Sequence, residues 1–185
     1  MKRLFCKPND CLLLVIDIQQ RLYQAMEVAF KDIFIKNSSI LIEVAAACKI
    51  PIIVSEQYPR GLGKTIDELE KVIPHKKREE KLYFSCYREE PIKAGIDLSG
   101  KKTVIVIGIE THVCVLQTVL DLLEADYRVV VATDAVCSRR QHDRLSALNA
   151  AADAGAVLYP TETIAFMLME KAGTPLFKRL SPLFK

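Results

Sequence analysis

The sequence has six cysteines but lacks both the paired CxxC spacing and any cysteine–histidine spacing typical of zinc modules. Structural zinc sites and small disulfide scaffolds depend on clustered cysteines. Here the cysteines are scattered over positions 6, 11, 48, 86, 114 and 137. We therefore expect reduced thiols and a cytoplasmic protein, with a mitochondrial location also open.

Long hydrophobic runs and concentrated positive charge are missing as well. No stretch approaches the ~18 apolar residues of a membrane span, and the opening MKRLFCKPND has no apolar core of a secretory signal. Lys and Arg number 26 against 23 Asp and Glu, which gives a formal net charge of +3. The densest basic stretch, HKKREEK at 75–81, includes two glutamates. We expect no membrane partner and no nucleic-acid partner.

The fingerprints of nucleotide binding are also missing. No GxGxxG follows the first apolar strand, as dinucleotide binding requires. GKT at 63–65 looks like the end of a P-loop, but that motif needs glycine where Tyr58 stands. We expect no cofactor.

What the sequence does contain is an alternation of apolar strands and helical patterns. A chain of 185 residues, 50% hydrophobic, suffices for one domain with a substantial core. The strands are expected at 11–17, 51–57, 101–110, 127–135 and 156–160, and the helices at 38–50, 65–73, 114–127, 143–155 and 161–173. This alternation predicts an α/β fold of three α-β-α layers around a Rossmann-like, mainly parallel sheet of about six strands.

Residues 1–185 show no repeat and no domain linker, so we expect a single domain. The tail at about 174–185, TPLFKRLSPLFK, is apolar yet punctuated by proline. Such a tail is suited to packing on a neighbouring subunit, and we expect a homo-oligomer.

In doubly wound α/β folds, ligands bind beyond the carboxyl ends of the strands. The search for a site therefore narrows to Asp17, Ser55–Tyr58, Ile109–Cys114 and Asp134–Arg139. Cys114 would occupy the first turn of a helix, where free backbone N–H groups and the helix dipole stabilise a thiolate and can hold an oxyanion. The alternative is that Cys114 is a small buried hydrophobic residue.

Two charged residues are candidates to assist Cys114. Asp17 ends the first strand and, from a neighbouring strand, could accept the thiol proton and pass it to a leaving amine; alternatively, it caps the following helix. Lys81 is followed by apolar residues that would carry its ammonium towards the core edge, where it would favour a thiolate and an oxyanion. Its alternative is a solvated lysine.

Four blocks carry a family resemblance over nearly the whole chain: LLLVIDIQQRL, EKLYFSCY, VIGIETHVCVLQTVLDLL and VVVATDAVCSR. The sequence resembles the isochorismatase-like cysteine hydrolases, a superfamily that includes nicotinamidases and N-carbamoylsarcosine amidases. The block at 108–116 is the most specific of them. SEQYPRGLG at 55–63 is similar to the non-metal branch that contains isochorismatase domain-containing proteins.

The resemblance implies a catalytic triad of Asp17, Lys81 and Cys114. It also implies a cis peptide at Ile109–Glu110, which turns backbone N–H groups towards an oxyanion in the turn that ends at Cys114. The reaction expected from it is hydrolysis of a small amide or related C–N bond through a covalent acyl-enzyme.

One departure from the superfamily concerns metal. Nicotinamidases carry an Asp and paired histidines after the second strand, whereas SEQYPRGLGKT contains no histidine. The three histidines lie far apart, at 75, 112 and 142. We expect no metal site, and His112 is expected to shape the nucleophile turn.

The substrate pocket is expected to be lined by Gln57, Tyr58, Arg88 and His112 around a small-molecule substrate. Two alternatives stay open at this point. One is a non-catalytic oligomeric or binding module that retains the fold; the other is vinyl-ether hydrolysis of the isochorismatase type.

Overall fold

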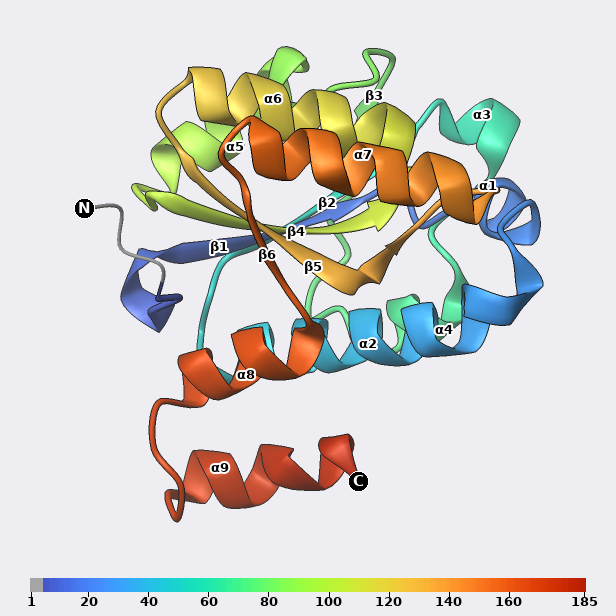
Figure 1. The fold of residues 1–185 in the computed structure, drawn as a ribbon. Helices are drawn as coiled ribbons and strands as arrows, with labels where there is room; N and C mark the ends of the chain where they lie inside the picture. The colour runs from blue at the N-terminus through green and yellow to red at the C-terminus, as the bar shows by residue number, and fades with distance from the viewer. Residues whose placement is uncertain (1–4) are drawn as a thin grey trace.

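A six-stranded parallel sheet forms the middle of the protein (Figure 1), with the strand order β3-β2-β1-β4-β5-β6. The computed structural model describes residues 5–185, so the first four residues of MKRLFCKPND lie outside it. The strands are β1 Cys11–Ile16, β2 Ile52–Gln57, β3 Glu79–Lys81, β4 Thr103–Ile109, β5 Arg128–Cys137 and β6 Val157–Tyr159. The predicted α/β fold is confirmed.

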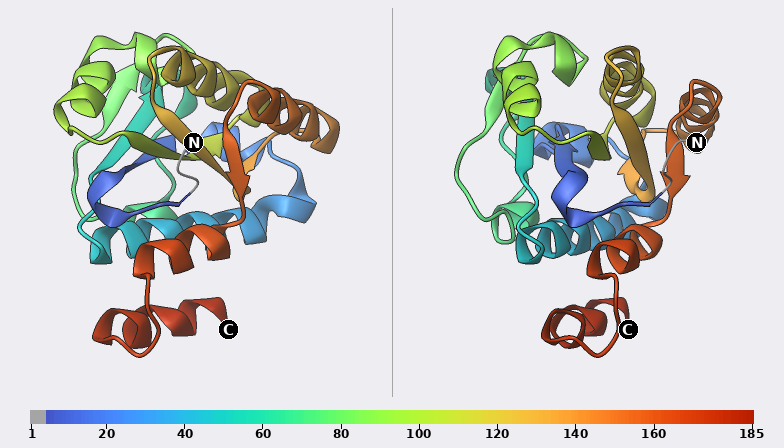
Figure 2. Two further views of the ribbon diagram at one scale, coloured as in Figure 1. Left: turned by 60° about the vertical axis from the view of Figure 1, so that its left-hand side comes forward. Right: turned by 90° about the vertical axis from the view of Figure 1, so that its left-hand side faces the viewer.

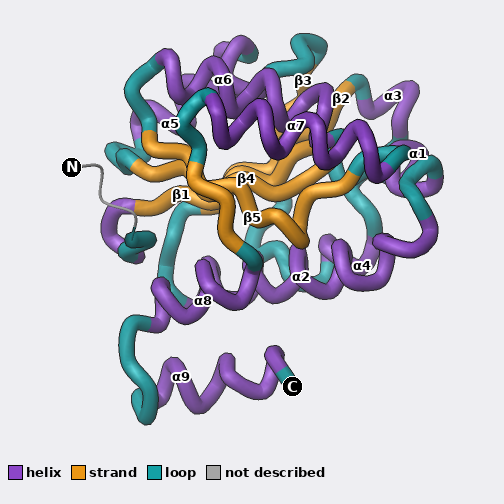
Figure 3. Tube along the Cα trace, in the orientation of Figure 1, coloured by secondary structure: helices purple, strands orange, loops and turns teal. Residues whose placement is uncertain are grey.

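Helices cover both faces of the sheet and complete the three layers (Figures 2 and 3). One face carries α2 (Val28–Ala47), α4 (Asp67–Glu70) and α8 (Thr161–Met169); the other carries α5 (Glu90–Leu98), α6 (Leu116–Glu124) and α7 (Gln141–Asp153). Two short helices, α1 (Gln20–Gln24) and α3 (Pro59–Leu62), lie at the carboxyl end of the strands (Figure 1). Single turns occupy Pro8–Asp10, Cys86–Arg88, Thr111–Val115 and Ser181–Phe184.

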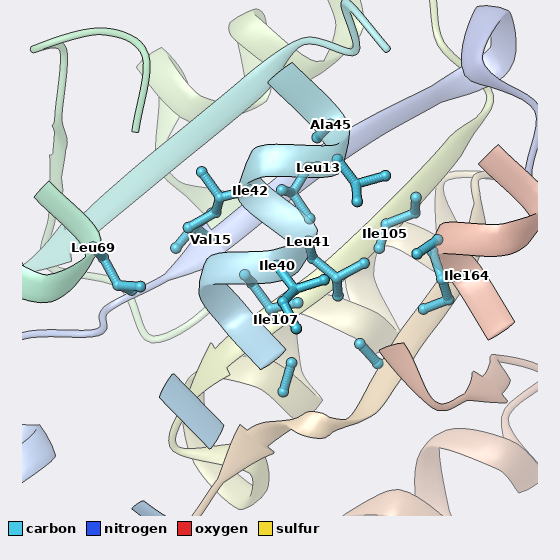
Figure 4. Packing of buried hydrophobic residues seen from close by; sticks show 14 of the residues in the cluster. Leu13, Val15, Ile40, Leu41, Ile42, Ala45, Leu69, Ile105, Ile107 and Ile164 are labelled. Carbon is cyan, nitrogen blue, oxygen red and sulfur yellow. The ribbon is translucent and has the colours of Figure 1, made fainter. Parts of the chain in front are cut away.

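The core consists of two apolar clusters, one on each face of the sheet. Successive side chains of a strand point to opposite faces, so Leu13 and Val15 of β1 enter one cluster while Leu12 and Leu14 enter the other. Figure 4 shows Leu13 and Val15 facing α2. Because both faces are covered, every residue of β1 and β4 is buried, which explains their continuous apolar runs.

The element boundaries differ from expectation where the sequence pattern is weak. The helix expected at 38–50 begins at Val28, and the one expected at 65–73 is reduced to α4. Neither β3 nor α5 was expected from the sequence. The strand β3 has no recognisable strand pattern, because it reads Glu-Glu-Lys and pairs through only three residues at the sheet edge. Tertiary pairing overrides local propensity at such short elements.

The carboxyl-terminal tail packs on its own chain. Residues 175–180 form α9 and the following turn ends at Phe184. The ring of Phe166 on α8 meets those of Phe177 and Phe184 edge-to-face, with centroids 6.0 and 5.4 Å apart, and Leu180 is buried. Packing of this tail on a neighbouring subunit stays a prediction. Among the described residues, no helix has the length and apolar character needed to cross a membrane.

Candidate active site

The ends of the two central strands meet where the candidate residues lie. Ile16 of β1 pairs with Gly108 of β4, so Asp17 and the turn after β4 project from the same edge of the sheet. A Cβ atom at Gly108 would lie 2.1 Å from the carbonyl oxygen of Ile16, and the φ angle of Gly108 is 137°. Only glycine fits this close approach of two backbones. Gly108 therefore lets the two chain segments that carry Asp17 and Cys114 come together.

Asp17 and Lys81 form an ion pair in the protein interior. The Lys81 Nζ lies 2.7 Å from the Asp17 Oδ2, and both side chains have no exposed surface. Asp17 also has a φ of 52°, a left-handed conformation that is costly for a residue other than glycine. Backbone strain of this kind clusters at functional sites.

The Lys81 ammonium makes three hydrogen bonds, all to acceptors other than Asp17. Nζ donates to the Gln57 Oε1 at 2.6 Å, to the Phe84 carbonyl at 2.9 Å and to the Tyr83 carbonyl at 3.2 Å. Burial is the largest single influence and acts to lower the pKa of Lys81, but the negative charge of Asp17 together with the smaller contributions of Cys86 and Cys114 outweighs it, and the pKa is raised. Lys81 is thus held as an ammonium facing a carboxylate.

The expected reason for the burial of Lys81 was wrong, although the residue is buried. The apolar side chains that follow it, those of residues 82–84, are themselves exposed by 54 to 73%. Lys81 is buried because it is the last residue of β3 and pairs with Gln57 on the neighbouring strand β2.

Ser55 holds the other oxygen of Asp17. Its Oγ donates to the Asp17 Oδ1 at 2.7 Å, and its carbonyl accepts from the Asp17 backbone N–H at 3.2 Å. The Cys86 thiol in turn donates to the Ser55 Oγ at 3.4 Å. Sequence reasoning placed Ser55 only among the strand ends and did not single out Cys86, because an isolated serine or cysteine on a buried element has no distinctive pattern.

Cys114 lies in a π-helical turn, Thr111–Val115, that separates β4 from α6. The peptide bond Ile109–Glu110, just before this turn, is cis, at the position that the family resemblance implies. The Cys114 side chain is buried, and its residue is only 5% exposed. The Thr118 hydroxyl donates to the Cys114 carbonyl at 2.7 Å and accepts the Cys86 N–H at 2.9 Å, which fixes the turn against its neighbours.

The thiol of Cys114 is not activated in the way the sequence suggested. Burial raises its pKa above the ordinary value, and the negative charge of Asp17 raises it further, while Lys81 opposes the shift. The expectation that a helix terminus and Lys81 produce a thiolate is therefore wrong for the free protein. Burial likewise raises the pKa of Cys86 to about 12. Both thiols are protonated at neutral pH.

The four expected pocket residues are divided between different places. Tyr58 lines a depression of about 290 Å³ together with Lys81, Leu82 and Glu89. Gln57 is buried, and its side-chain oxygen accepts a hydrogen bond from the Lys81 ammonium.

Arg88 and His112 do not line that depression. Arg88 is an exposed residue on the turn after β3, and it forms a two-bonded ion pair with Asp121 of α6. The His112 Nδ1 lies 3.0 Å from the Ser138 Oγ, beside a second depression that Arg139 and Arg140 line. Arg139 also pairs with Glu110 at 2.7 Å, so His112 and Glu110 both connect the turn Thr111–Val115 to the segment after β5.

Metal ligands do not gather in the part of the chain described here. Among residues 5–185, no group of three or more His, Cys, Asp or Glu side chains is arranged to hold a metal ion. The expectation of a metal-independent site stays a prediction.

Residues 11–163 match the family model of the isochorismatase domain. The chain belongs to the isochorismatase family. It is 38% identical over 180 residues to isochorismatase family protein 1A of Dictyostelium discoideum, which covers 95% of this chain and 86% of the relative. It is also 34% identical over 182 residues to isochorismatase domain-containing protein 2 of Bos taurus, covering 96% and 84%.

Solved structures of this family share the fold. A structure named MAR1 ribonuclease from Caenorhabditis elegans has a TM-score of 0.89 and 35% identity, over 97% of this chain and 91% of that one. The YcaC gene product of Escherichia coli, described as an octameric hydrolase of unknown specificity, has a TM-score of 0.92 and 25% identity, over 100% and 91%. The fold is therefore that of the isochorismatase-family hydrolases.

Proposed function

We propose that this protein is a cysteine hydrolase that cleaves a small amide or a related C–N bond through a covalent acyl-enzyme. The observation that carries the proposal is the buried Asp17–Lys81 ion pair beside the Cys114 thiol. A buried ion pair contributes little net stability compared with apolar packing, so its retention favours a chemical role.

In the first half of the reaction, Asp17 takes the proton of the Cys114 thiol as the sulfur attacks the substrate carbonyl carbon. Backbone N–H groups of the turn from Ile109 and Glu110 to Cys114 stabilise the oxyanion. The C–N bond then breaks, and Asp17 gives its proton to the leaving nitrogen. A thioester of Cys114 and a free amine result.

In the second half, water attacks the thioester while Asp17 accepts a proton from it. The C–S bond breaks, the carboxylic acid leaves, and the proton returns to the sulfur of Cys114. Lys81 remains an ammonium throughout and stabilises negative charge on its neighbours. The raised pKa of Cys114 suits this scheme, because the resting thiol carries the proton that the leaving nitrogen needs.

Two features support a homo-oligomer. The E. coli structural neighbour is described as octameric. In this chain Leu82, Tyr83 and Phe84 expose large apolar side chains directly after Lys81, and contiguous exposed apolar surface is typical of interaction sites. Light scattering of the purified protein tests this part of the proposal, and a monomeric mass across the accessible concentration range would contradict it.

Turnover of a panel of small amides tests the proposed reaction, with release of ammonia or amine as the readout. We expect at least one amide to be hydrolysed by the wild-type protein and none by Cys114→Ala. The panel includes a vinyl ether and, because one structural neighbour bears the name ribonuclease, an RNA oligonucleotide. Cleavage of either by Cys114→Ala, or the absence of any amide turnover, would contradict the proposal.

A further inference from the structure

The two oxygens of the Asp17 carboxylate have different neighbours: Oδ1 accepts a hydrogen bond, whereas Oδ2 has an ion-pair contact and no hydrogen-bond partner among the described residues. Lys81 lies against Oδ2 at 2.7 Å, and the Ser55 hydroxyl donates to Oδ1 at 2.7 Å. Ser55, like Asp17, has no exposed surface. Rotation of the carboxylate about its terminal bond would break the hydrogen bond from Ser55, and a hydrogen bond to an ionised group is among the stronger protein hydrogen bonds.

The position of Ser55 follows from the strand register. Ser55 of β2 pairs with Ile16 of β1, directly before Asp17. Side chains two residues apart on a strand share a face, and Gln57, two residues after Ser55, contacts Lys81. One face of β2 thus supports both charged members of the site, Asp17 through Ser55 and Lys81 through Gln57.

The Asp17 carboxylate determines which way the Ser55 hydroxyl points. A serine hydroxyl has one proton to donate, and an ionised carboxylate can only accept. The Ser55 proton is therefore directed to Asp17, and the Cys86 thiol, 3.4 Å from the Ser55 Oγ, donates to the hydroxyl oxygen. Cys86 is itself fully buried and is anchored by its N–H on Thr118.

We propose that Ser55 is a positioning residue for the hydrolysis: its hydroxyl fixes the Asp17 carboxylate in the orientation that exchanges a proton with Cys114. This inference rests on the proposed function, because it assigns Asp17 as the proton acceptor. Ser55 touches neither the substrate nor the sulfur of Cys114 in this role; it acts through Asp17.

The test is the pH dependence of Cys114 alkylation by iodoacetamide, measured by peptide mapping of the full-length protein between about pH 6 and pH 11. In the wild type, we expect the rate at Cys114 to fall towards acid pH, along an acid limb, because the protonated thiol does not react. In Ser55→Ala the Asp17 carboxylate loses the hydrogen bond that disperses its negative charge, so we expect the acid limb of the Cys114 thiol to move upward by about one pH unit. Ser55→Thr keeps the hydroxyl and is expected to restore the wild-type limb.

Two further variants separate the possible failures. Asp17→Asn removes the negative charge that raises the pKa of the Cys114 thiol, so the acid limb should move to lower pH. Ser38→Ala removes another fully buried serine, on α2, and should leave the profile unchanged. If Ser55→Ala does not fold, Ser55→Cys replaces it, and the weaker thiol donor should give a smaller shift in the same direction.

The outcomes are distinct. A limb that moves in Ser55→Ala and returns in Ser55→Thr supports the inference, whereas a merely structural role would lower stability without moving the limb. An unchanged limb in Ser55→Ala, with the limb moved to lower pH in Asp17→Asn, overturns the inference and leaves the proposed function standing. An Asp17→Asn profile identical to the wild type overturns both.

Discussion

The Lys81 Nζ and the Asp17 Oδ2 lie 2.7 Å apart in the protein interior with neither side chain exposed, although Lys81 ends β3 and Asp17 directly follows β1. The effect of changing such an ion pair on the free energy of unfolding depends on whether one partner or both are replaced. Removal of one partner leaves an uncompensated buried charge, whereas replacement of both partners by neutral groups often costs little. A comparison of single and double variants can therefore separate the contribution of the Asp17–Lys81 pair to stability from its contribution to the proposed reaction.

Asp17→Ala and Lys81→Ala should each lower the free energy of unfolding by about 3–5 kcal/mol, because each strands the opposite charge. The double variant Asp17→Asn with Lys81→Met should cost less than the sum of the two single variants. Urea denaturation of the three proteins provides the measurement. The control is Arg88→Ala, which removes an exposed ion pair with Asp121 and is expected to have no measurable effect. Single variants as stable as the wild type would place both side chains in solvent.

The thiol of Cys114 should remain protonated in the free protein at neutral pH. Burial and the nearby Asp17 charge raise its pKa, so the neutral form persists as the pH rises to the ordinary value of about 9 and beyond it. The difference in absorbance near 240 nm between the wild type and Cys114→Ala reports the thiolate. We expect no difference at pH 7 and its appearance only in alkaline solution; a thiolate band at neutral pH would show that the site lowers the pKa.

Gly108→Ala should prevent the formation of a stable fold. Its Cβ would overlap the Ile16 carbonyl oxygen at 2.1 Å, at a φ of 137° that other residues rarely adopt. Gly95→Ala is the matched control, because a Cβ there meets only the end of the Ile53 side chain at 3.2 Å and alanine favours a helix. Soluble yield and melting temperature decide the comparison. A Gly108→Ala protein with a wild-type melting temperature would refute the close approach of β1 and β4.

Exhaustive chelation should leave both the melting temperature and any amide hydrolysis unchanged. The stretch after β2 has no histidine, and its buried Glu56 accepts both the N–H and the hydroxyl of Thr65 at 2.7 Å. That carboxylate oxygen is therefore occupied by the protein. Stoichiometric zinc or iron in the purified protein, with activity restored only by metal, would contradict this prediction.

The sequence predicted the central part of the fold well because the two-sided burial of β1 and β4 produces unbroken apolar runs. It could not predict β3, whose three residues are mostly charged and are held by pairing with β2. The rule that ligands bind beyond the carboxyl ends of parallel strands correctly pointed to the sheet edge where Asp17 and Cys114 lie. The role of Ser55 depends on its register with Ile16, which no local pattern encodes.

The state of Cys114 shows a different limit of sequence reasoning. A cysteine after a strand and before a helix predicts a thiol stabilised as a thiolate by the helix terminus. The sequence does not reveal that Cys114 lies inside a π-helical turn and is nearly inaccessible beside Asp17. Desolvation and the carboxylate then dominate its ionisation. Burial in the folded protein raises the pKa of Cys114, whereas the local sequence pattern predicted a lowered pKa.

The most direct test of the account is intact-mass spectrometry of the wild-type protein during turnover of an amide found in the panel, followed by peptide mapping. The account predicts an added mass equal to the acyl group of the substrate, located on the peptide that contains Cys114. It also predicts that the adduct is absent from Cys114→Ala and disappears when the substrate is exhausted. Turnover with no adduct in the wild type, or with an acyl group on another residue, would contradict the assignment of Cys114 as the nucleophile.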